Sequence, residues 1–311
     1  MTWNPRIGIN PIGWMNDDLP SLGGDTPLDT ALAEGRAIGY AGFELGNKFP
    51  SEPEELKTRL GRFGLACVSG WYSGFLAEAL DAPDGDAAVA REAQRCVAHM
   101  RKLRHNGCEL VVYGECAGTV QGRMDTPVSR RPQLRGEPAW REYARRLDAF
   151  GQHLLEAYGL RLAYHHHMGA CVESPQDVDR LMELTDPRKV FLLFDTGHAY
   201  FGGAARPQEL LRRHVHRVAH VHCKDVRPQL IAKARNESWS FLRGVLAGVF
   251  TVPGDGALDF RAVLRTLHEA GYAGWLVVEA EQDPAVAPSE PYARKGFETL
   301  RALVDELGAG A

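Results

Sequence analysis

Two short stretches of the sequence place metal-binding and proton-transferring side chains directly behind apolar runs. The run VFLLF precedes Asp195 and His198, and the run VAHV precedes His222 and Lys224. A short apolar run of this kind is typical of a strand that is buried on both faces. Alternation of strands with helices makes such strands parallel, so their carboxyl ends point to the same side of the domain. We therefore expect the four side chains to share one site.

Potential ligands also follow other apolar runs. Glu115 follows ELVVY, the three histidines 165–167 follow LRLAY, and Glu279 follows GWLVV. Burying this many carboxylates without a counter-charge is costly, because each unpaired charge must be desolvated. A divalent cation bound by Asp195, His222, Glu279 and a ligand from the fifth strand would provide the counter-charge. Mixed carboxylate and imidazole donors suit manganese, cobalt or iron better than calcium, which prefers oxygen ligands alone.

Each of these residues also has a purely structural explanation. Asp195 could cap the helix that follows it, His222 could be a hydrogen-bonded core histidine, and Lys224 could form a surface ion pair. Three successive strands that end in potential ligands favour a metal site over coincidence. For Glu44 and Glu115, catalytic and structural roles both stay open.

Aromatic residues in the predicted loops could form part of a binding pocket. Trp14 and Trp71 are expected at the rim, where an indole ring can stack against the apolar face of a sugar or cyclitol ring. Packing in the core is the commoner role of tryptophan and remains the alternative.

Eight alternations of strand and helix can be identified along the chain. The expected strands are 6–10, 40–45, 64–68, 109–113, 160–164, 190–194, 218–221 and 274–278. The expected helices are 27–39, 53–62, 87–106, 139–158, 175–185, 207–214, a helix that starts after Asp259, and 292–307. Eight such units indicate a single (β/α)8 TIM barrel over residues 1–311, whose strand ends all converge on one pocket. A doubly wound open sheet is disfavoured because no G-x-G-x-x-G follows the first strand.

One segment of this barrel is longer than a simple connection. It covers about 229–256 and contains Trp239 and Phe241. We expect these rings to be exposed, so the segment could be a lid over the site or a contact in a homo-oligomer.

Composition excludes several classes of partner. The 311 residues carry a formal net charge of −4, with 36 Lys and Arg against 40 Asp and Glu, so no global basic field predicts nucleic acid binding. No apolar run is long enough to span a membrane, and the amino terminus lacks the pattern of a signal peptide. The six cysteines form no C-x-x-C pair, which is typical of reduced thiols in a cytoplasmic protein.

Several motifs carry a resemblance to a known family. FDTGHA, HVHCKD and PGDGALDF followed by GYAGWLVVE resemble the xylose-isomerase-like superfamily of sugar isomerases and epimerases. PIGWMNDD, ECAGTVQG, YHHHMG, LLFDTGHAYFGG and HVHCKDVR resemble, within it, the inosose dehydratases of myo-inositol catabolism. The match extends over nearly the whole chain.

The resemblance implies a metal held by a glutamate, an aspartate, a histidine and a glutamate from the fifth to eighth strands. Asp195, His222 and Glu279 match the last three positions, and His198 matches a histidine that contacts the substrate. The fifth strand departs from the pattern, because AYHHHMG stands where many relatives carry the glutamate.

Three residues are alternatives for the fourth ligand. His165 and His167 point to the same side of the strand by alternation, and Glu173 follows a few residues later.

The resemblance also implies a reaction: removal of water from 2-keto-myo-inositol (scyllo-inosose) through an enolate, to give a trihydroxycyclohexane-1,2-dione, with Mn2+ or Co2+ as cofactor. This chemistry needs a base for the proton α to the ketone and an acid for the leaving hydroxide. His198 and His167 are the candidates, with Lys224 and Glu115 in reserve, and His165 could bind substrate. A metal-dependent sugar or cyclitol isomerase or epimerase shares the enolate and is the alternative function.

Overall fold

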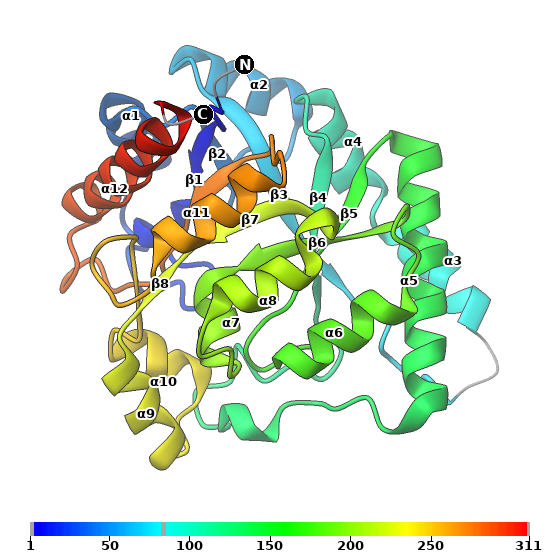
Figure 1. Ribbon diagram of the computed structural model, residues 1–311. Helices are drawn as coiled ribbons and strands as arrows, with labels where there is room; N and C mark the ends of the chain where they lie inside the picture. Colours follow the sequence, from blue (N-terminus) through cyan, green and yellow to red (C-terminus); the bar gives the residue numbers. More distant parts are fainter. Residues whose placement is uncertain (1–2, 82–84, 310–311) are drawn as a thin grey trace.

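The centre of the computed structural model, which describes residues 3–81 and 85–309, is a closed barrel of parallel strands (Figure 1). The strands follow one another around it in the order β1-β10-β7-β6-β5-β4-β3-β2. They are β1 (Ile7–Ile9), β2 (Gly42–Leu45), β3 (Ala66–Gly74), β4 (Leu110–Glu115), β5 (Arg161–His165), β6 (Val190–Asp195), β7 (Val218–Cys223) and β10 (Leu276–Val278). Because all neighbouring strands are parallel, their carboxyl ends meet at one end of the barrel. The predicted TIM barrel is confirmed.

Helices surround the barrel and cover its outer face (Figure 1). They are α1 (Leu28–Ile38), α2 (Pro53–Arg62), α3 (Gly85–Arg95), α4 (Val97–His105), α5 (Gly136–Tyr158), α6 (Pro175–Leu184), α7 (Thr196–Phe201), α8 (Pro207–His214), α11 (Phe260–Glu269) and α12 (Ser289–Ala309). Apolar faces of these helices pack on strands that are buried on both sides, which explains why β6 reads as a continuous apolar run.

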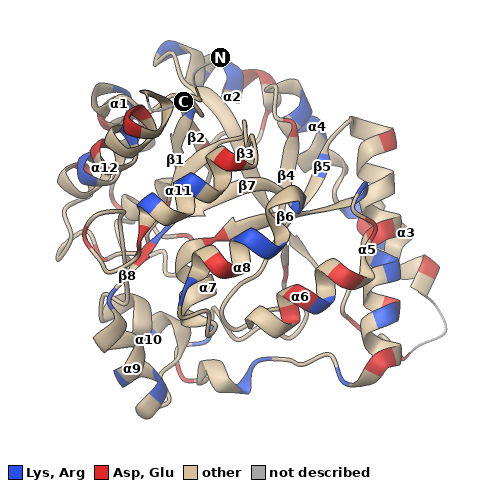
Figure 2. Cartoon of the chain, in the orientation of Figure 1, with Lys and Arg blue, Asp and Glu red and all other residues tan. Residues whose placement is uncertain are grey.

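Positive and negative side chains are interspersed over the outer helices (Figure 2). This distribution agrees with the small net charge of −4. Among the described residues, no helix has the length and apolar character needed to cross a bilayer. All six cysteines carry free thiols.

The predicted helix 87–106 is instead two helices, α3 and α4, which are interrupted at Cys96. Cys96 is fully buried, and its thiol donates a hydrogen bond to the carbonyl of Ala93. Helical hydrogen bonds continue on both sides of it, from Cys96 N–H to the carbonyl of Glu92 and from Met100 N–H to the carbonyl of Cys96, so the interruption is local. Glu92 of α3 then accepts hydrogen bonds from the hydroxyl of Tyr72 and the backbone N–H of Phe75, while Met100 of α4 is buried in the core.

The segment 229–256 is folded rather than extended over the rim. It contains α9 (Pro228–Asn236), α10 (Phe241–Leu246) and β9 (Phe250–Thr251), which pairs with β8 (Asp225–Val226).

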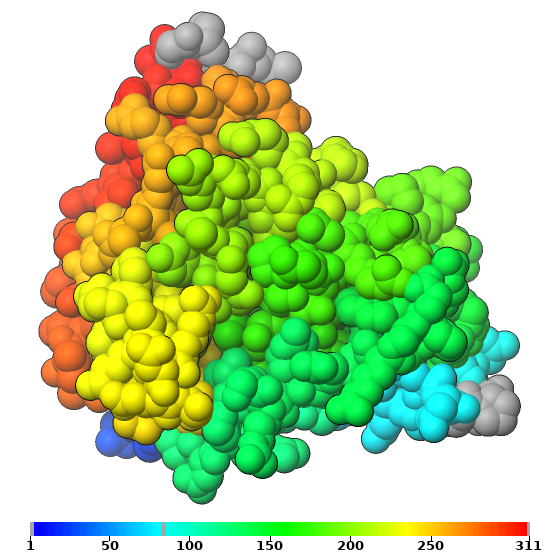
Figure 3. Space-filling model, turned by 60° about the horizontal axis from the view of Figure 1, so that its bottom comes forward, coloured from blue at the N-terminus to red at the C-terminus, as the bar shows by residue number. Residues whose placement is uncertain are grey.

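The expected exposure of Trp239 and Phe241 in this segment is wrong, because the two rings are 6% and 0% exposed. They belong to a small apolar core that also includes Val128. The backbone N–H of Val128 donates to the carbonyl of Trp239, so the loop after β4 lies against this segment (Figure 3).

Helix α5 can approach the chain before β6 closely because residue 151 is glycine. An added Cβ would lie 2.4 Å from the backbone oxygen of Lys189. Gly151→Ala should therefore lower the free energy of unfolding by about 1–3 kcal/mol. Gly61→Ala in α2 is the matched control, since no atom lies within 4 Å of its Cβ, and it should raise stability by about 0.5–1 kcal/mol. Urea unfolding midpoints measure both effects, and a Gly151→Ala protein as stable as the wild type would contradict this packing.

Candidate metal centre and active-site cavity

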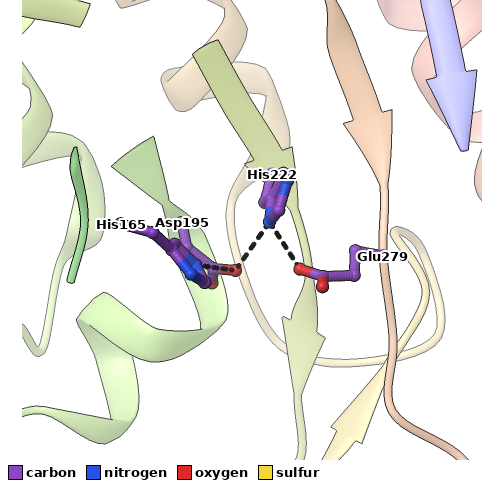
Figure 4. A group of neighbouring side chains, drawn as sticks. All are labelled: His165, Asp195, His222 and Glu279. Carbon is purple, nitrogen blue, oxygen red and sulfur yellow. Dashed lines mark hydrogen bonds and ion pairs between the residues drawn. The ribbon is translucent and has the colours of Figure 1, made fainter. Parts of the chain in front are cut away.

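Four side chains from four consecutive barrel strands converge at the carboxyl end of the barrel (Figure 4). His165 ends β5, Asp195 ends β6, His222 lies on β7, and Glu279 follows β10. All four are buried, and each offers a ligand atom within 4.8 Å of the others. The structure thus brings together the three predicted ligands and one of the three alternatives for the fourth.

The facing atoms of this group suit a cation. His222 Nδ1 lies 2.6 Å from Glu279 Oε2 and 3.6 Å from Asp195 Oδ2, and His165 Nε2 lies 3.5 Å from the same Asp195 oxygen. Neither His222 Nδ1 nor Glu279 Oε2 has a hydrogen-bond partner of acceptable geometry. Buried polar atoms of native proteins are normally satisfied. Two imidazoles and two carboxylates that face one another in this way form a donor set for a divalent transition metal.

Glu44 of β2 contacts the Nε2 side of the His222 ring. Its carboxylate lies 3.0 Å from His222 Nε2 and 2.7 Å from His220 Nε2, and it accepts hydrogen bonds from Asn10 and Ser69. Burial alone would raise the pKa of Glu44, but the His222 and His220 rings hold this pKa well below its usual range. An ionised Glu44 can only accept, so His222 Nε2 carries a proton, which leaves Nδ1 as the nitrogen that would bind a metal.

Lys224 provides a fixed positive charge behind the group. Its Nζ lies 2.8 Å from Glu281 Oε1, 3.2 Å from Glu279 Oε2 and 3.4 Å from Asp195 Oδ2. The side chain is fully buried. Burial would lower the pKa of Lys224, but Asp195, Glu279 and Glu281 raise it above its ordinary value. The ammonium therefore stays charged.

The neighbouring backbone sets the tautomer of His167 but not that of His198. His167 Nδ1 lies 2.8 Å from the carbonyl of Met168, which can only accept, so Nδ1 carries the proton and Nε2 the lone pair. His198 lies between two donors, because the N–H of Met168 faces its Nδ1 at 3.2 Å and the Lys224 ammonium faces its Nε2 at 3.0 Å, so these contacts do not fix its tautomer. Burial is the main cause that lowers the pKa of both residues. Both imidazoles are therefore neutral near pH 7.

Lys224 connects His198 and Glu281. Its ammonium donates to Glu281 Oε1 at 2.8 Å and lies 3.0 Å from His198 Nε2, whereas His198 Nε2 lies 3.6 Å from Glu281 Oε1, beyond hydrogen-bond distance. Glu281 thus accepts from Lys224, and His198 lies beside this pair.

A cavity of about 460 Å3 opens onto this site. His165, His167, Glu279 and Glu281 lie at one end of it. The other lining residues are Asn10, Ile12, Asp17, Asp18, Leu45, Gly46, Asn47, Phe49, Ser51, Trp71, Ser73, His99, Lys102 and Gln121. His198 and Lys224 are not among them and lie behind the wall. They can act on a bound molecule only through a residue such as Glu281 that lines the cavity.

Trp71 lines the cavity but belongs to the end of β3 and not to a loop. Its ring meets His165 edge to face, with centroids 5.5 Å apart, and its N–H donates to Ser73. The ring lies over Gly114, where an added Cβ would come within 1.9 Å of it. Trp71 can therefore form a flat apolar wall beside the metal centre.

Trp14 and Glu115 lie outside the cavity. Trp14 is 2% exposed, donates to Glu34 and packs against Phe43, so we assign it to the core. Glu115 accepts hydrogen bonds from the hydroxyls of Tyr113 and Tyr143 and from two backbone N–H groups. Burial raises the pKa of Glu115 to about 7. Neither residue lines the cavity.

The other two alternatives for the fourth ligand also lie apart from the group of four. Glu173 accepts from the N–H of Gly169 and pairs with Arg131. His167 groups with His198 and Glu281 instead. The geometry favours His165 as the fourth ligand.

Some lining residues were not identified as site residues from the sequence. Asp18 and Gln121 could have been found, because they lie inside the motifs PIGWMNDD and ECAGTVQG. His99 and Lys102 carry no such signal, because polar residues are normal on the exposed face of a helix.

Comparison with known proteins identifies the family of this chain. The family model described as "Xylose isomerase-like TIM barrel" matches residues 32–303. The rhizopine catabolism protein MocC of Rhizobium meliloti is 48% identical, over 97% of this chain and 90% of its own length. An inosose dehydratase of Geobacillus thermodenitrificans is 42% identical, over 95% of this chain and 96% of its own.

Among solved structures, an L-ribulose 3-epimerase superposes with a TM-score of 0.69 at 17% identity, covering 99% of this chain and 97% of its own. At this identity the likeness concerns the fold. The chain belongs to the xylose isomerase-like TIM barrel family and, within it, to the group that contains the inosose dehydratases.

Proposed function

We propose that this protein is a hydro-lyase that removes water from 2-keto-myo-inositol in the catabolism of myo-inositol. The observation that carries this proposal is the full-length similarity to inosose dehydratases. It coincides with a buried group of two histidines and two carboxylates that opens onto a cavity. The cavity is large enough for a six-membered ring and presents polar groups along its walls, as a polyhydroxylated substrate requires.

His165, Asp195, His222 and Glu279 would hold a divalent cation, for which we propose Mn2+ or Co2+. Such a cation supplies Lewis acidity that stabilises negative charge developing on a carbonyl oxygen. Without this stabilisation a proton α to a ketone is too weakly acidic for a side-chain base. Trp71 lies beside this group and would orient the ring through its apolar face.

The residues that transfer protons can be assigned from the ring nitrogen of His167 that carries no proton. His167 lines the cavity with an unprotonated Nε2, so it would remove the proton α to the ketone. Glu281, which accepts from the Lys224 ammonium, would hold the β hydroxyl, and the His167 imidazolium formed in the first step would give its proton to the β hydroxide, which leaves as water. Loss of one proton and one hydroxide gives the enol, which tautomerises to the dione.

The first test is metal removal followed by an assay on 2-keto-myo-inositol. Protein stripped with a chelator should show no dione absorbance, and Mn2+ or Co2+ should restore it, because the enolate is then stabilised. Solvent deuterium exchange at the α carbon without dione would instead indicate an isomerase or epimerase. Full activity of the metal-free protein would refute the proposal.

Substitution of the ligands tests the assignment of the site. Asp195→Asn and His222→Ala should each abolish turnover, measured as dione formation, while circular dichroism reports an intact barrel. Asp25→Asn, at an exposed position, is the control and should retain full activity. Wild-type turnover in either ligand variant would mean that the metal lies elsewhere.

The contact between Glu44 and His222 gives a finer prediction. Glu44→Gln replaces the ionised carboxylate that accepts from His222 Nε2 with a neutral amide that can also donate, and it should weaken metal binding by about 10–100-fold. Calorimetric titration of the metal-free protein measures this change. Glu55→Gln, on the exposed face of α2, should leave the affinity unaltered, and equal affinities in all three proteins would exclude the supporting role of Glu44.

A further inference from the structure

The cavity extends well beyond the residues that the proposed reaction uses. From the catalytic end it reaches the loop between β2 and α2, which contributes Asn47, Phe49 and Ser51, and helix α4, which contributes His99 and Lys102. We call the part lined by these five residues the cationic arm. None of them has a role in the proton transfers or in the metal centre.

The barrel wall between β2 and β3 explains how α4 reaches the cavity. The register of the two strands shifts between Phe43 and Leu45, and Leu45 is paired with Gly70. Gly70 has no side chain, and an added Cβ would lie 3.2 Å from the ring of His99. Glycine at this position lets the His99 ring lie directly against the strand, beside the irregular pairing.

Lys102 gives the arm a positive charge that the protein does not neutralise. Among the residues that the structure describes, no acidic side chain forms an ion pair with its ammonium, which is half-buried. Burial lowers the pKa of Lys102. A cation that is partly removed from water and unpaired is costly unless an anion joins it.

His99 adds a second unsatisfied group. Its Nε2 is buried and forms no hydrogen bond of acceptable geometry, although the backbone of Gly70 lies close to the ring. Burial and the adjacent Lys102 ammonium lower the pKa of His99 to about 4, so the ring is neutral. The side chains of Ser51 and Asn47 also line the cavity and can donate, while the backbone N–H of Asn47 already donates to Asp17, an acidic lining residue. Donors from several directions around one cation suit an oxyanion with several acceptor oxygens.

We propose that the cationic arm binds a phosphate-class oxyanion next to the cyclitol ring at the catalytic end. The anion could be a phosphate ester on the ring itself or a free phosphate bound beside it. The position of the ring rests on the proposed function, whereas the anion site rests on Lys102 and its neighbours alone.

Calorimetric titration of the metal-loaded protein distinguishes these sources. The probes are myo-inositol, myo-inositol 1-phosphate and inorganic phosphate. The monophosphate should bind about tenfold or more tightly than myo-inositol, which is the size of one charge-assisted hydrogen bond. Inorganic phosphate that binds together with myo-inositol would identify the free anion as the ligand.

Variants of the arm show whether its residues are responsible for phosphate binding. Lys102→Met should lose the preference for the phosphate-bearing probes while myo-inositol still binds, and Ser51→Ala should weaken it. Lys57→Met, at an exposed position on α2, is the control and should behave as the wild type. Phosphate binding that is unchanged in Lys102→Met would place the anion on the metal and overturn the proposal.

The same titrations separate failure of the arm from failure of the proposed function. Lys102-dependent phosphate binding without any binding of myo-inositol would support the anion site and contradict a cyclitol substrate. Equal binding of all three probes to wild type and Lys102→Met would overturn the anion site and leave the proposed reaction intact.

Discussion

The burial of carboxylates at the carboxyl ends of the strands is the constraint on which this structure depends. Glu44, Asp195, Glu279 and Glu281 are all at least 94% buried. Each would be costly to ionise alone, so the surrounding residues must supply positive charge or hydrogen bonds. Lys224 lies between three of them, and Glu44 accepts from the groups around it. Small residues leave the necessary space: a Cβ at Gly197 would lie 2.6 Å from the side chain of Lys224.

Much of the fold could be predicted from the sequence, because a parallel barrel repeats one local pattern. Each apolar run is a strand buried on both faces, and the polar residue that ends it marks the rim. Asp195, His222 and Glu279 could therefore be placed together without coordinates. Their ligand atoms indeed face one another.

The predictions from the sequence fail where tertiary contacts override the local sequence pattern. The break at Cys96 lies inside a sequence that favours one helix throughout, and only the contact of Glu92 with β3 indicates it. Trp14 and Trp239 both lie in segments that connect predicted strands and helices, where rim residues are expected. Each is nevertheless buried in a core that includes segments distant in sequence. Lys102 resembles any surface lysine until the irregular β2–β3 pairing brings the cavity to it.

The histidine at position 165 is consistent with the charge of its surroundings. Asp195 and Glu279 would together balance one divalent cation in the proposed metal centre, while Lys224 pairs with Glu281. A glutamate in place of His165 would add a negative charge that no described group nearby neutralises, and it would reduce the positive potential of a bound cation. A neutral imidazole keeps the centre electropositive, which is the condition for stabilising a developing enolate. The departure from the ligand pattern of the wider superfamily and the presence of a buried lysine are therefore two parts of one electrostatic arrangement.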